Sequence, residues 1–328
     1  MTNYQQLFER FNSLTILVIG DVMIDAYMWG KVDRISPEAP VPVLTSTKRE
    51  HRFGGAANVA LNVQALGATP ILCSVIGNDD KADIFHQLLQ NNQLTDKGIL
   101  SDSSRITTTK TRIISGTQHL LRIDEEVTKP LHEQLQERFF AHIANVISND
   151  KIDAIIFEDY DKGAITPSII SRVVELAKSK NIPTLVDPKK RNFMSYHGVT
   201  LFKPNFKELS EGLKMEVDKK NYDAIFEAAR EINRQLGARY TMTTLSERGV
   251  LITDGEVYAA IPAEIRNIAD VSGAGDTVIS VASLCLALGL APKEIAAISN
   301  LAGGLGCETV GVVPVNKKQL LEECLKKL

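Results

Sequence analysis

Residues 270–277, with the sequence DVSGAGDT, combine two glycines, an alanine and two aspartates. Small residues let another molecule approach the backbone closely, and the apolar spacing after Gly275 predicts that a helix follows. The first amides of a helix lack internal partners and the dipole makes that end positive, so an anion can bind there. Asp276 could then take a proton from a hydroxyl while the amides stabilise charge on a phosphoryl group. An aspartate that merely favours the helix dipole is the open alternative.

A second glycine cluster, FGGAANVA at residues 53–60, also precedes a predicted helix. Gly54 and Gly55 permit close approach to the backbone. Asn58 offers both a donor and an acceptor, which suits a molecule with many hydroxyls. A tight helix start with no ligand explains the same residues equally well.

Several other kinds of site lack their sequence signatures. There is no GxxxxGK[ST] phosphate-binding loop, and no GxGxxG follows the first predicted strand, which argues against a nicotinamide-dependent oxidoreductase. The six histidines show no paired zinc-ligand spacing. The four cysteines form no CxxC pair and are expected to be reduced thiols. They are Cys73, Cys285, Cys307 and Cys324.

The composition of the 328 residues predicts a large core and no polyanionic partner. Hydrophobic residues make up 44%, and 37 Lys and Arg against 40 Asp and Glu give a net charge of -3. This balance argues against nucleic acid or an anionic membrane as the main partner. The N-terminus is polar and the first apolar run, residues 14–20, is too short for a signal or membrane helix. We therefore expect a cytoplasmic protein.

Short apolar runs alternate with segments of helical periodicity, which predicts an α/β protein with a mostly parallel sheet covered on both faces. The predicted strands are 14–20, 68–77, 151–159, 182–187, 199–205 and 239–245, and the predicted helices are 54–66, 81–92, 166–181 and 224–237. Helices are expected to dominate from residue 273 onward.

Two stretches interrupt this alternation. Residues 26–52 contain prolines at positions 37, 40 and 42, and residues 103–126 are rich in Thr and Ile. Both patterns are typical of exposed antiparallel strands. We expect the two stretches to meet as a small β-sheet lid on a single domain that spans residues 1–328. The apolar lid strands further predict a homodimer through lid-to-lid contact.

GGAANVA and DVSGAGDT, in this order and separation, resemble the two signatures of the ribokinase family of sugar kinases, also called the phosphofructokinase-B group. The resemblance covers essentially the whole chain and implies a three-layer α/β/α fold with a β-lid. The segments RISPEAPVPVL, LLRIDEE, EDYDKGAI, VDPK and KPNFKEL are similar to those of family members that phosphorylate D-glycero-β-D-manno-heptose 7-phosphate. In many bacteria such a kinase is one half of a bifunctional heptose enzyme. No nucleotidyltransferase HxGH motif is present.

The resemblance implies roles for residues that match the family motifs. Asp276 would be the catalytic base, and the amides of Gly273, Ala274 and Gly275 would form the anion site. Asn205 and Glu208 match an NxxE motif that places Mg²⁺ and the ATP phosphates, although Asn followed by Glu also caps helices. Ser246, Gly249 and Asn300 resemble nucleotide-side residues, with an ordinary turn and a polar helix position as alternatives. A monovalent cation such as K⁺ is expected near Asp270.

On the sugar side, Asp25 and Asp159 would contact the substrate together with Gly54, Gly55 and Asn58. Lys189 and Arg122 would hold the 7-phosphate, although Arg122 could instead form an ion pair within the lid. Three departures from the family pattern lie on this side, namely Ala26, residues 116–118 with the sequence GTQ, and Lys190.

The predicted reaction is therefore ATP-dependent phosphorylation of the C1 hydroxyl of heptose 7-phosphate, giving the 1,7-bisphosphate for ADP-heptose and lipopolysaccharide. The alternatives are a family kinase for fructose, ribose or a nucleoside, and a non-catalytic sugar or nucleotide sensor. The intact GAGD sequence argues against the sensor, because a sensor does not need the base.

Overall fold

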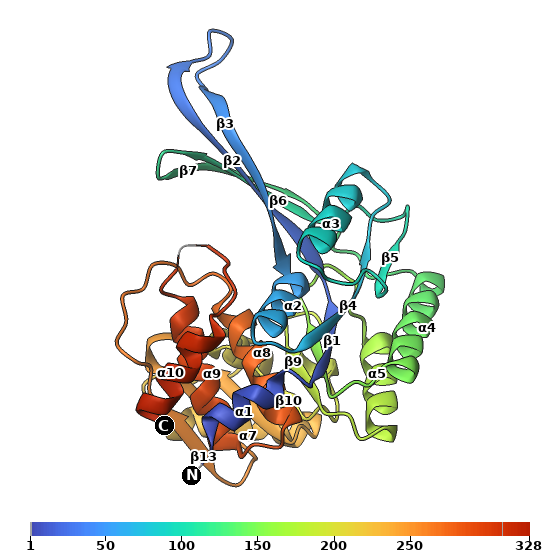
Figure 1. Ribbon diagram of the computed structural model, residues 1–328, viewed down its shortest axis with the longest axis vertical. Helices are drawn as coiled ribbons and strands as arrows, with labels where there is room; N and C mark the ends of the chain where they lie inside the picture. Colours follow the sequence, from blue (N-terminus) through green and yellow to red (C-terminus); the bar gives the residue numbers. More distant parts are fainter. Residues whose placement is uncertain (1, 310) are drawn as a thin grey trace.

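Nine strands form one sheet in the order β13-β12-β11-β10-β9-β8-β1-β4-β5 in the computed structural model, which describes residues 2–309 and 311–328 (Figure 1). Adjacent strands run parallel, except that β12 is antiparallel to both β11 and β13. The strands are β1 (Thr15–Gly20), β4 (Thr69–Ile76), β5 (Ile99–Ser101), β8 (Ala154–Glu158), β9 (Thr184–Asp187), β10 (Leu201–Phe202), β11 (Tyr240–Thr244), β12 (Val250–Thr253) and β13 (Tyr258–Ile261).

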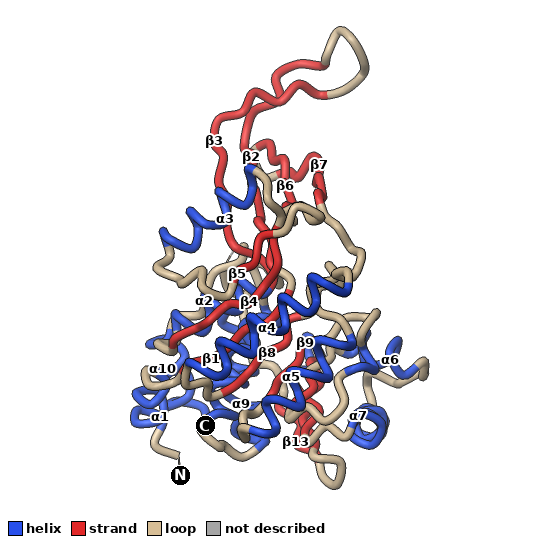
Figure 2. The backbone as a smooth tube through the Cα atoms, turned by 90° about the vertical axis from the view of Figure 1, so that its right-hand side faces the viewer, coloured by secondary structure: helices blue, strands red, loops and turns tan. Residues whose placement is uncertain are grey.

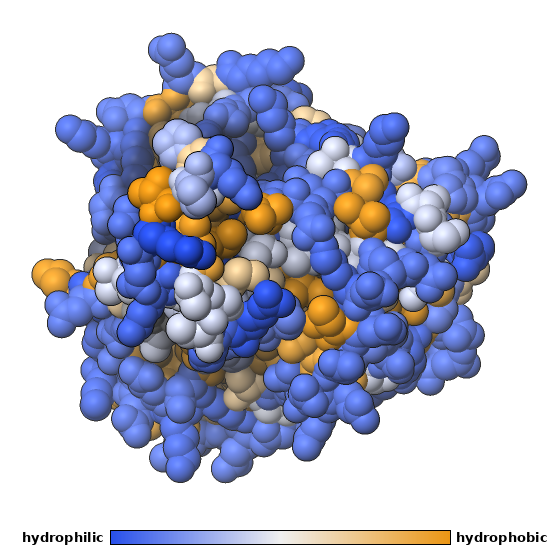
Figure 3. Space-filling model, turned by 90° about the horizontal axis from the view of Figure 1, so that it is seen from above, coloured by the Kyte–Doolittle hydropathy of each residue, from blue (hydrophilic) through white to orange (hydrophobic). Residues whose placement is uncertain are grey.

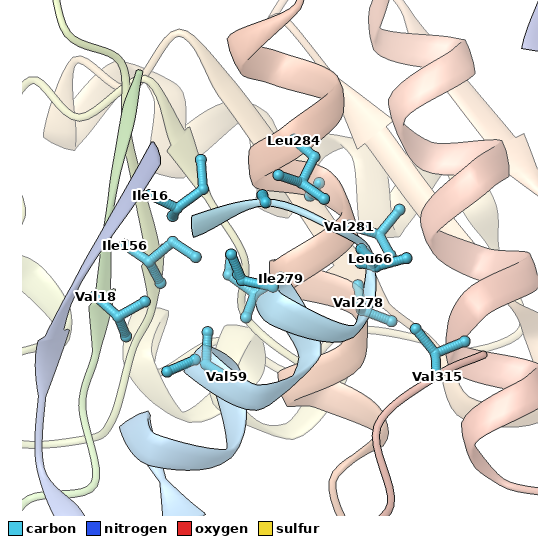
Figure 4. Close-up of a cluster of buried hydrophobic side chains, with 14 of the residues drawn as sticks. Ile16, Val18, Val59, Leu66, Ile156, Val278, Ile279, Val281, Leu284 and Val315 are labelled. Atoms are coloured by element: carbon cyan, nitrogen blue, oxygen red, sulfur yellow. The ribbon is translucent and has the colours of Figure 1, made fainter. Parts of the chain in front are cut away.

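Helices cover both faces of this sheet, so the molecule has three layers. Side chains of a strand point alternately to its two faces, and in β1 Ile16 and Val18 join one apolar cluster while Leu17 and Ile19 join the other. Figure 4 shows Ile16 and Val18 near side chains of two helices, α2 and α8. The predicted α/β/α fold is confirmed.

Two groups of helices fill the outer layers. Helices α1, α2, α3, α8, α9 and α10 contribute to the first cluster, and α4 to α7 contribute to the second. The helices are α1 (Tyr4–Phe11), α2 (Ala56–Ala65), α3 (Asp80–Asn91), α4 (Glu133–Asn149), α5 (Pro167–Ser179), α6 (Phe206–Leu213), α7 (Tyr222–Leu236), α8 (Ala274–Ala287), α9 (Pro292–Gly306) and α10 (Lys317–Lys327), with short 3₁₀ turns at Phe193–Ser195 and Ser246–Arg248. No helix of the described residues combines the length and apolar character that crossing a membrane requires.

A four-stranded sheet, the lid, projects from one end of the body (Figures 1 and 2). Its order is β3-β2-β6-β7, with β2 (Val22–Ile35), β3 (Pro42–Gly55), β6 (Thr109–Ser115) and β7 (Gln118–Glu125). Both predicted stretches thus contribute strands to one small sheet. β2 and β3 extend further into the body than expected. Residues 103–108 are not in a strand, and buried Arg105 among them donates to the carbonyl oxygen of Lys129.

The carboxyl ends of the parallel strands lie where the lid begins. Asp21 separates β1 from β2, so the lid grows directly out of the end of β1. Glu158 and Asp187 are the last residues of β8 and β9, and Lys203 follows β10. Ligands of open α/β sheets bind at this edge, so the topology brings these charged side chains together at a candidate site.

Candidate active site

Asp276 lies in the first turn of α8 and is only 5% exposed. Its carboxylate accepts hydrogen bonds from Asn58 Nδ2 (2.6 Å) and from the Tyr160 hydroxyl (3.0 Å). Burial raises the pKa of Asp276 to about 6, and nearby Asp187 adds to the rise, while the two hydrogen bonds oppose it. A carboxylate with such a pKa is suited to accept a proton near neutral pH.

The backbone before Asp276 is shaped for close approach. Gly273 has a φ of 79°, a left-handed conformation that favours glycine at the start of α8. A Cβ atom added to Gly275 would lie 3.4 Å from Asp187 Oδ2 and 3.7 Å from Lys203 Nζ. One predicted member of the anion site is already engaged, because the Ala274 amide donates to the Val271 carbonyl oxygen at 3.3 Å.

Buried charges surround the base. Carboxylate oxygens of Glu158, Asp187 and Asp276 all lie within 4.8 Å of one another, and Lys203 Nζ contacts Asp187 at 2.7 Å. Burial raises the pKa of Glu158 well above its usual range, and the charges of Asp187 and Asp276 raise it further. Glu158 Oε2 is buried and has no hydrogen-bond partner among the described residues. Oxygen ligands of this kind suit a Mg²⁺ ion.

Asn205 and Glu208 form a reciprocal helix cap at the start of α6. Asn205 Oδ1 accepts the Glu208 amide at 2.8 Å, and Glu208 Oε2 accepts the Asn205 amide at 2.9 Å. Glu208 Oε1 also accepts a hydrogen bond from Lys189 Nζ at 2.7 Å. Burial would lower the pKa of Lys189, but Asp187 and Glu208 raise it on balance, so Lys189 stays charged. The NxxE residues therefore form a helix cap, and the same Glu208 carboxylate also binds a cation, as a residue beside ATP phosphates would.

The predicted nucleotide-side residues lie around the antiparallel end of the sheet. Ser246 is exposed and follows β11, whose Thr244 forms a bridge with Asn205. Gly249 has a φ of 86°, and a Cβ atom there would collide with the Ile261 carbonyl oxygen. Asn300 Nδ2 donates to the Pro262 carbonyl oxygen at 2.8 Å. Gly249 and Asn300 thus have structural roles at this end of the sheet.

Asp25 and the two glycines of β3 lie together at the base of the lid. Asp25 is 5% exposed, and Arg112 Nη1 of β6 donates to its Oδ1 at 2.5 Å. A Cβ atom on Gly54 would lie 2.6 Å from Asp25 Oδ2, and one on Gly55, at a φ of 59°, would collide with the backbone of Asp21. These glycines let β3 pass close to two aspartates.

Two predicted substrate contacts are buried and hydrogen-bonded within the protein. Asn58 is 1% exposed and its amide donates to Asp276, so it holds the base rather than offering a free polar group. Asp159 is also 1% exposed. It accepts hydrogen bonds from Asn192 Nδ2 (2.9 Å) and from the Tyr196 hydroxyl (2.8 Å), which gives it a structural role.

The two predicted phosphate-binding cations both form ion pairs. Lys189 pairs with Glu208, a residue of the NxxE motif. The Arg122 side chain is 58% exposed and pairs with Asp124, which is the lid ion pair considered as its alternative. Arg112 and Arg52, which the sequence motifs did not single out, lie nearer Asp25: Arg112 binds it, and Arg52 is its register partner on β3.

Comparison with known proteins identifies the family. The model of the pfkB family of carbohydrate kinases matches residues 13–319. The chain belongs to the pfkB family. The bifunctional protein HldE of Koribacter versatilis is 40% identical over 311 residues, which cover 94% of this chain. The chain spans 62% of the length of that relative.

Solved structures share the pfkB-family fold at low sequence identity. Phosphofructokinase-2 from Escherichia coli in complex with potassium has a TM-score of 0.75 at 17% identity, covering 94% of this chain and 97% of its own. Arabidopsis thaliana ribokinase complexed with ribose and ATP has a TM-score of 0.72 at 16% identity, covering 94% and 99%. These likenesses confirm the ribokinase-like architecture.

Proposed function

We propose that the protein transfers the γ-phosphoryl group of ATP to the C1 hydroxyl of D-glycero-β-D-manno-heptose 7-phosphate, giving the 1,7-bisphosphate for ADP-heptose and lipopolysaccharide synthesis. The observation that carries the kinase assignment is the buried Asp276 carboxylate, with a pKa of about 6, at a glycine-lined helix start. The heptose motifs and the similarity to a protein named HldE support the substrate. An ATP-dependent step of this kind belongs in the cytoplasm.

In this reaction Asp276 takes the proton as the sugar C1 oxygen attacks the γ-phosphorus. The new C1 O–P bond forms while the bond to the β-phosphate oxygen breaks, so that ADP leaves. The helix-start amides and Lys203, close to Gly275, would stabilise charge on the transferring group. Such transfers depend mainly on positioning and electrostatics, and closure of the lid would exclude water.

Divalent metal would supply charge neutralisation on the ATP phosphates. The carboxylates of Glu158 and Asp187 could hold it, and Glu208 could act through water. We expect turnover to require Mg²⁺ or Mn²⁺. Glu208→Gln should raise the Mg²⁺ concentration that gives half-maximal rate, because it removes a negative charge near the proposed metal ion. Glu211→Gln, on the same helix but 50% exposed beside Lys207, is the matched control. Undiminished rates in excess chelator would contradict the metal requirement.

A monovalent cation near Asp270 is a further part of the proposal. Asp270 accepts hydrogen bonds from the amides of Ser272 (2.9 Å) and Gly311 (3.0 Å), so its carboxylate ties together the loop before α8 and the loop after α9. A cation bound there would order the anion site. A potassium titration that leaves the rate unchanged would exclude this activation.

Arg52 and Arg112 are the cations that we propose for the substrate phosphate, in exchange for their ion pairs with Glu50 and Asp25. Their guanidinium carbons lie 5.0 Å and 5.3 Å from the centre of the Tyr27 ring, so both flank one side chain on the lid face that carries Asp25. Guanidinium groups recognise phosphate through paired hydrogen bonds. A sugar held by Asp25 could therefore direct its distal phosphate to this pair.

Kinases for fructose, ribose or a nucleoside are the second candidate function, because the fold is shared with phosphofructokinase-2 and ribokinase. A non-catalytic sensor is less favoured, since Asp276 and its partners are in place. An ADP-release assay over a panel of sugars and sugar phosphates separates these functions. Heptose 7-phosphate should give the highest kcat/KM, and a higher value with fructose 6-phosphate or ribose would favour the second candidate.

We also propose that the lid forms a homodimer. Leu121 and Ile123 of β7 are 56% and 43% exposed, and they alternate with Arg122, so they lie on the lid face opposite the candidate site. Figure 3, viewed from the lid end, shows apolar side chains (orange) at the surface. Sedimentation velocity at micromolar concentration should give a dimer, and Leu121→Asp with Ile123→Asp should give a monomer. A monomeric parent protein would refute this contact.

A further inference from the structure

Tyr160 lies in the EDYDKGAI segment and contacts the proposed base, a contact that the sequence does not predict. Its hydroxyl donates to Asp276 Oδ1 at 3.0 Å, while Asn58 donates to the other oxygen, Oδ2. Each carboxylate oxygen has a second lone pair, so Asp276 can still accept a proton from a substrate. Two donors on two oxygens fix the plane of the carboxylate.

The loop that carries Tyr160 is held by a second buried aspartate, Asp21, which is 2% exposed. Asp21 Oδ2 accepts the amides of Tyr160 (2.9 Å) and Lys162 (3.0 Å), and Oδ1 accepts the amide of Ala164 (2.9 Å). Asp161 within this loop has a φ of 56°, which is uncommon for a residue other than glycine. A strained loop fixed by three amide bonds gives the Tyr160 side chain a defined position.

Two separate elements therefore hold the base. Asn58 donates from α2 and Tyr160 donates from the loop after β8, one to each carboxylate oxygen. Without the Tyr160 hydroxyl, only Asn58 would limit rotation of the carboxylate about its Cβ–Cγ bond. The Tyr160 hydroxyl therefore sets the direction in which Asp276 presents its lone pairs.

We propose that Tyr160, fixed by Asp21, is a positioning residue that orients the Asp276 carboxylate for proton abstraction. This inference rests on the proposed kinase function. It assigns Tyr160 no contact with the substrate, because the Tyr160 hydroxyl is engaged by Asp276.

Tyr160→Phe tests the inference, because it removes only the hydroxyl and keeps the ring. A base that turns away from the attacking hydroxyl slows the chemical step without weakening substrate binding. We therefore expect kcat with ATP and heptose 7-phosphate to fall by about 10–100-fold, while KM for both substrates stays near the parent value.

Tyr196→Phe is the matched control, because the Tyr196 hydroxyl donates to Asp159 and not to Asp276. It should lower thermal stability and leave kcat unchanged. Tyr160→Phe with an unchanged kcat, or with a raised KM for the sugar phosphate as its main effect, would overturn the inference. A parent protein without kinase activity would instead refute the proposed function, so the two failures are distinguishable.

Discussion

Asp276→Asn should lower kcat by about 10²–10⁴-fold, which is the usual contribution of a positioned general base. The amide is nearly the same size as the carboxylate, and the Tyr160 hydroxyl can turn to accept from it. The fold and ATP binding should therefore persist. Steady-state kinetics of ADP release measure the first effect, and a direct ATP-binding titration measures the second.

Asp223→Asn provides the control for this change of carboxylate to amide. Asp223 lies in the first turn of α7, where it accepts a hydrogen bond from Tyr258, away from the candidate site. Its substitution should leave kcat unchanged. If Asp276→Asn kept more than about half of the parent rate, Asp276 could not be the base, since base loss normally costs at least about a hundredfold.

A distal phosphate on the sugar should raise kcat/KM by at least about a hundredfold over the neutral heptose. Each hydrogen bond to a charged group contributes about 1.5–3 kcal/mol. Two such contacts, from Arg52 and Arg112, would contribute about 3–6 kcal/mol if they add, which is roughly 10²–10⁴ in specificity. Kinetics with heptose 7-phosphate and with heptose measure the ratio directly.

Arg52→Ala and Arg112→Ala should each reduce this ratio by roughly tenfold or more, because each removes one charged contact. Arg112→Ala should also weaken binding of the neutral sugar, since Arg112 positions Asp25. Arg49→Ala is the control, because Arg49 is exposed and lies on the opposite face of β3 from Arg52. Similar kcat/KM values for heptose and its 7-phosphate would refute the substrate and favour another sugar kinase.

Much of the fold could be predicted from the sequence, because buried parallel strands read as short apolar runs. β1 and β4 were placed to within a residue or two of their observed ends. α1 was missed because its N-terminal segment is largely polar, although Leu7, Phe8 and Phe11 bury one face. α4 was also missed, since it follows the irregular lid segment. The β12–β13 hairpin was missed because it interrupts the pattern of parallel strands.

The parts of the candidate site that lie within one sequence motif could be predicted. The parts that depend on the order and register of strands distant in sequence could not. Asp276 could be predicted because the aspartate and the small residues that begin its helix are adjacent in the sequence. Glu158 and Lys203 belong to segments that were recognised, but only the sheet order places them beside Asp187. Arg112 meets Asp25 because β6 pairs with β2, a register that the sequence does not specify.

Phosphorus NMR of the reaction mixture tests the central claim most directly. The protein would be incubated with ATP, Mg²⁺ and D-glycero-β-D-manno-heptose 7-phosphate. We predict that ADP forms in equal amount with a new anomeric phosphate signal, while the signal of the C7 phosphate is retained, and that Asp276→Asn abolishes both changes. ADP with no anomeric phosphate, or the same product at the parent rate from Asp276→Asn, would contradict the proposed reaction and its base.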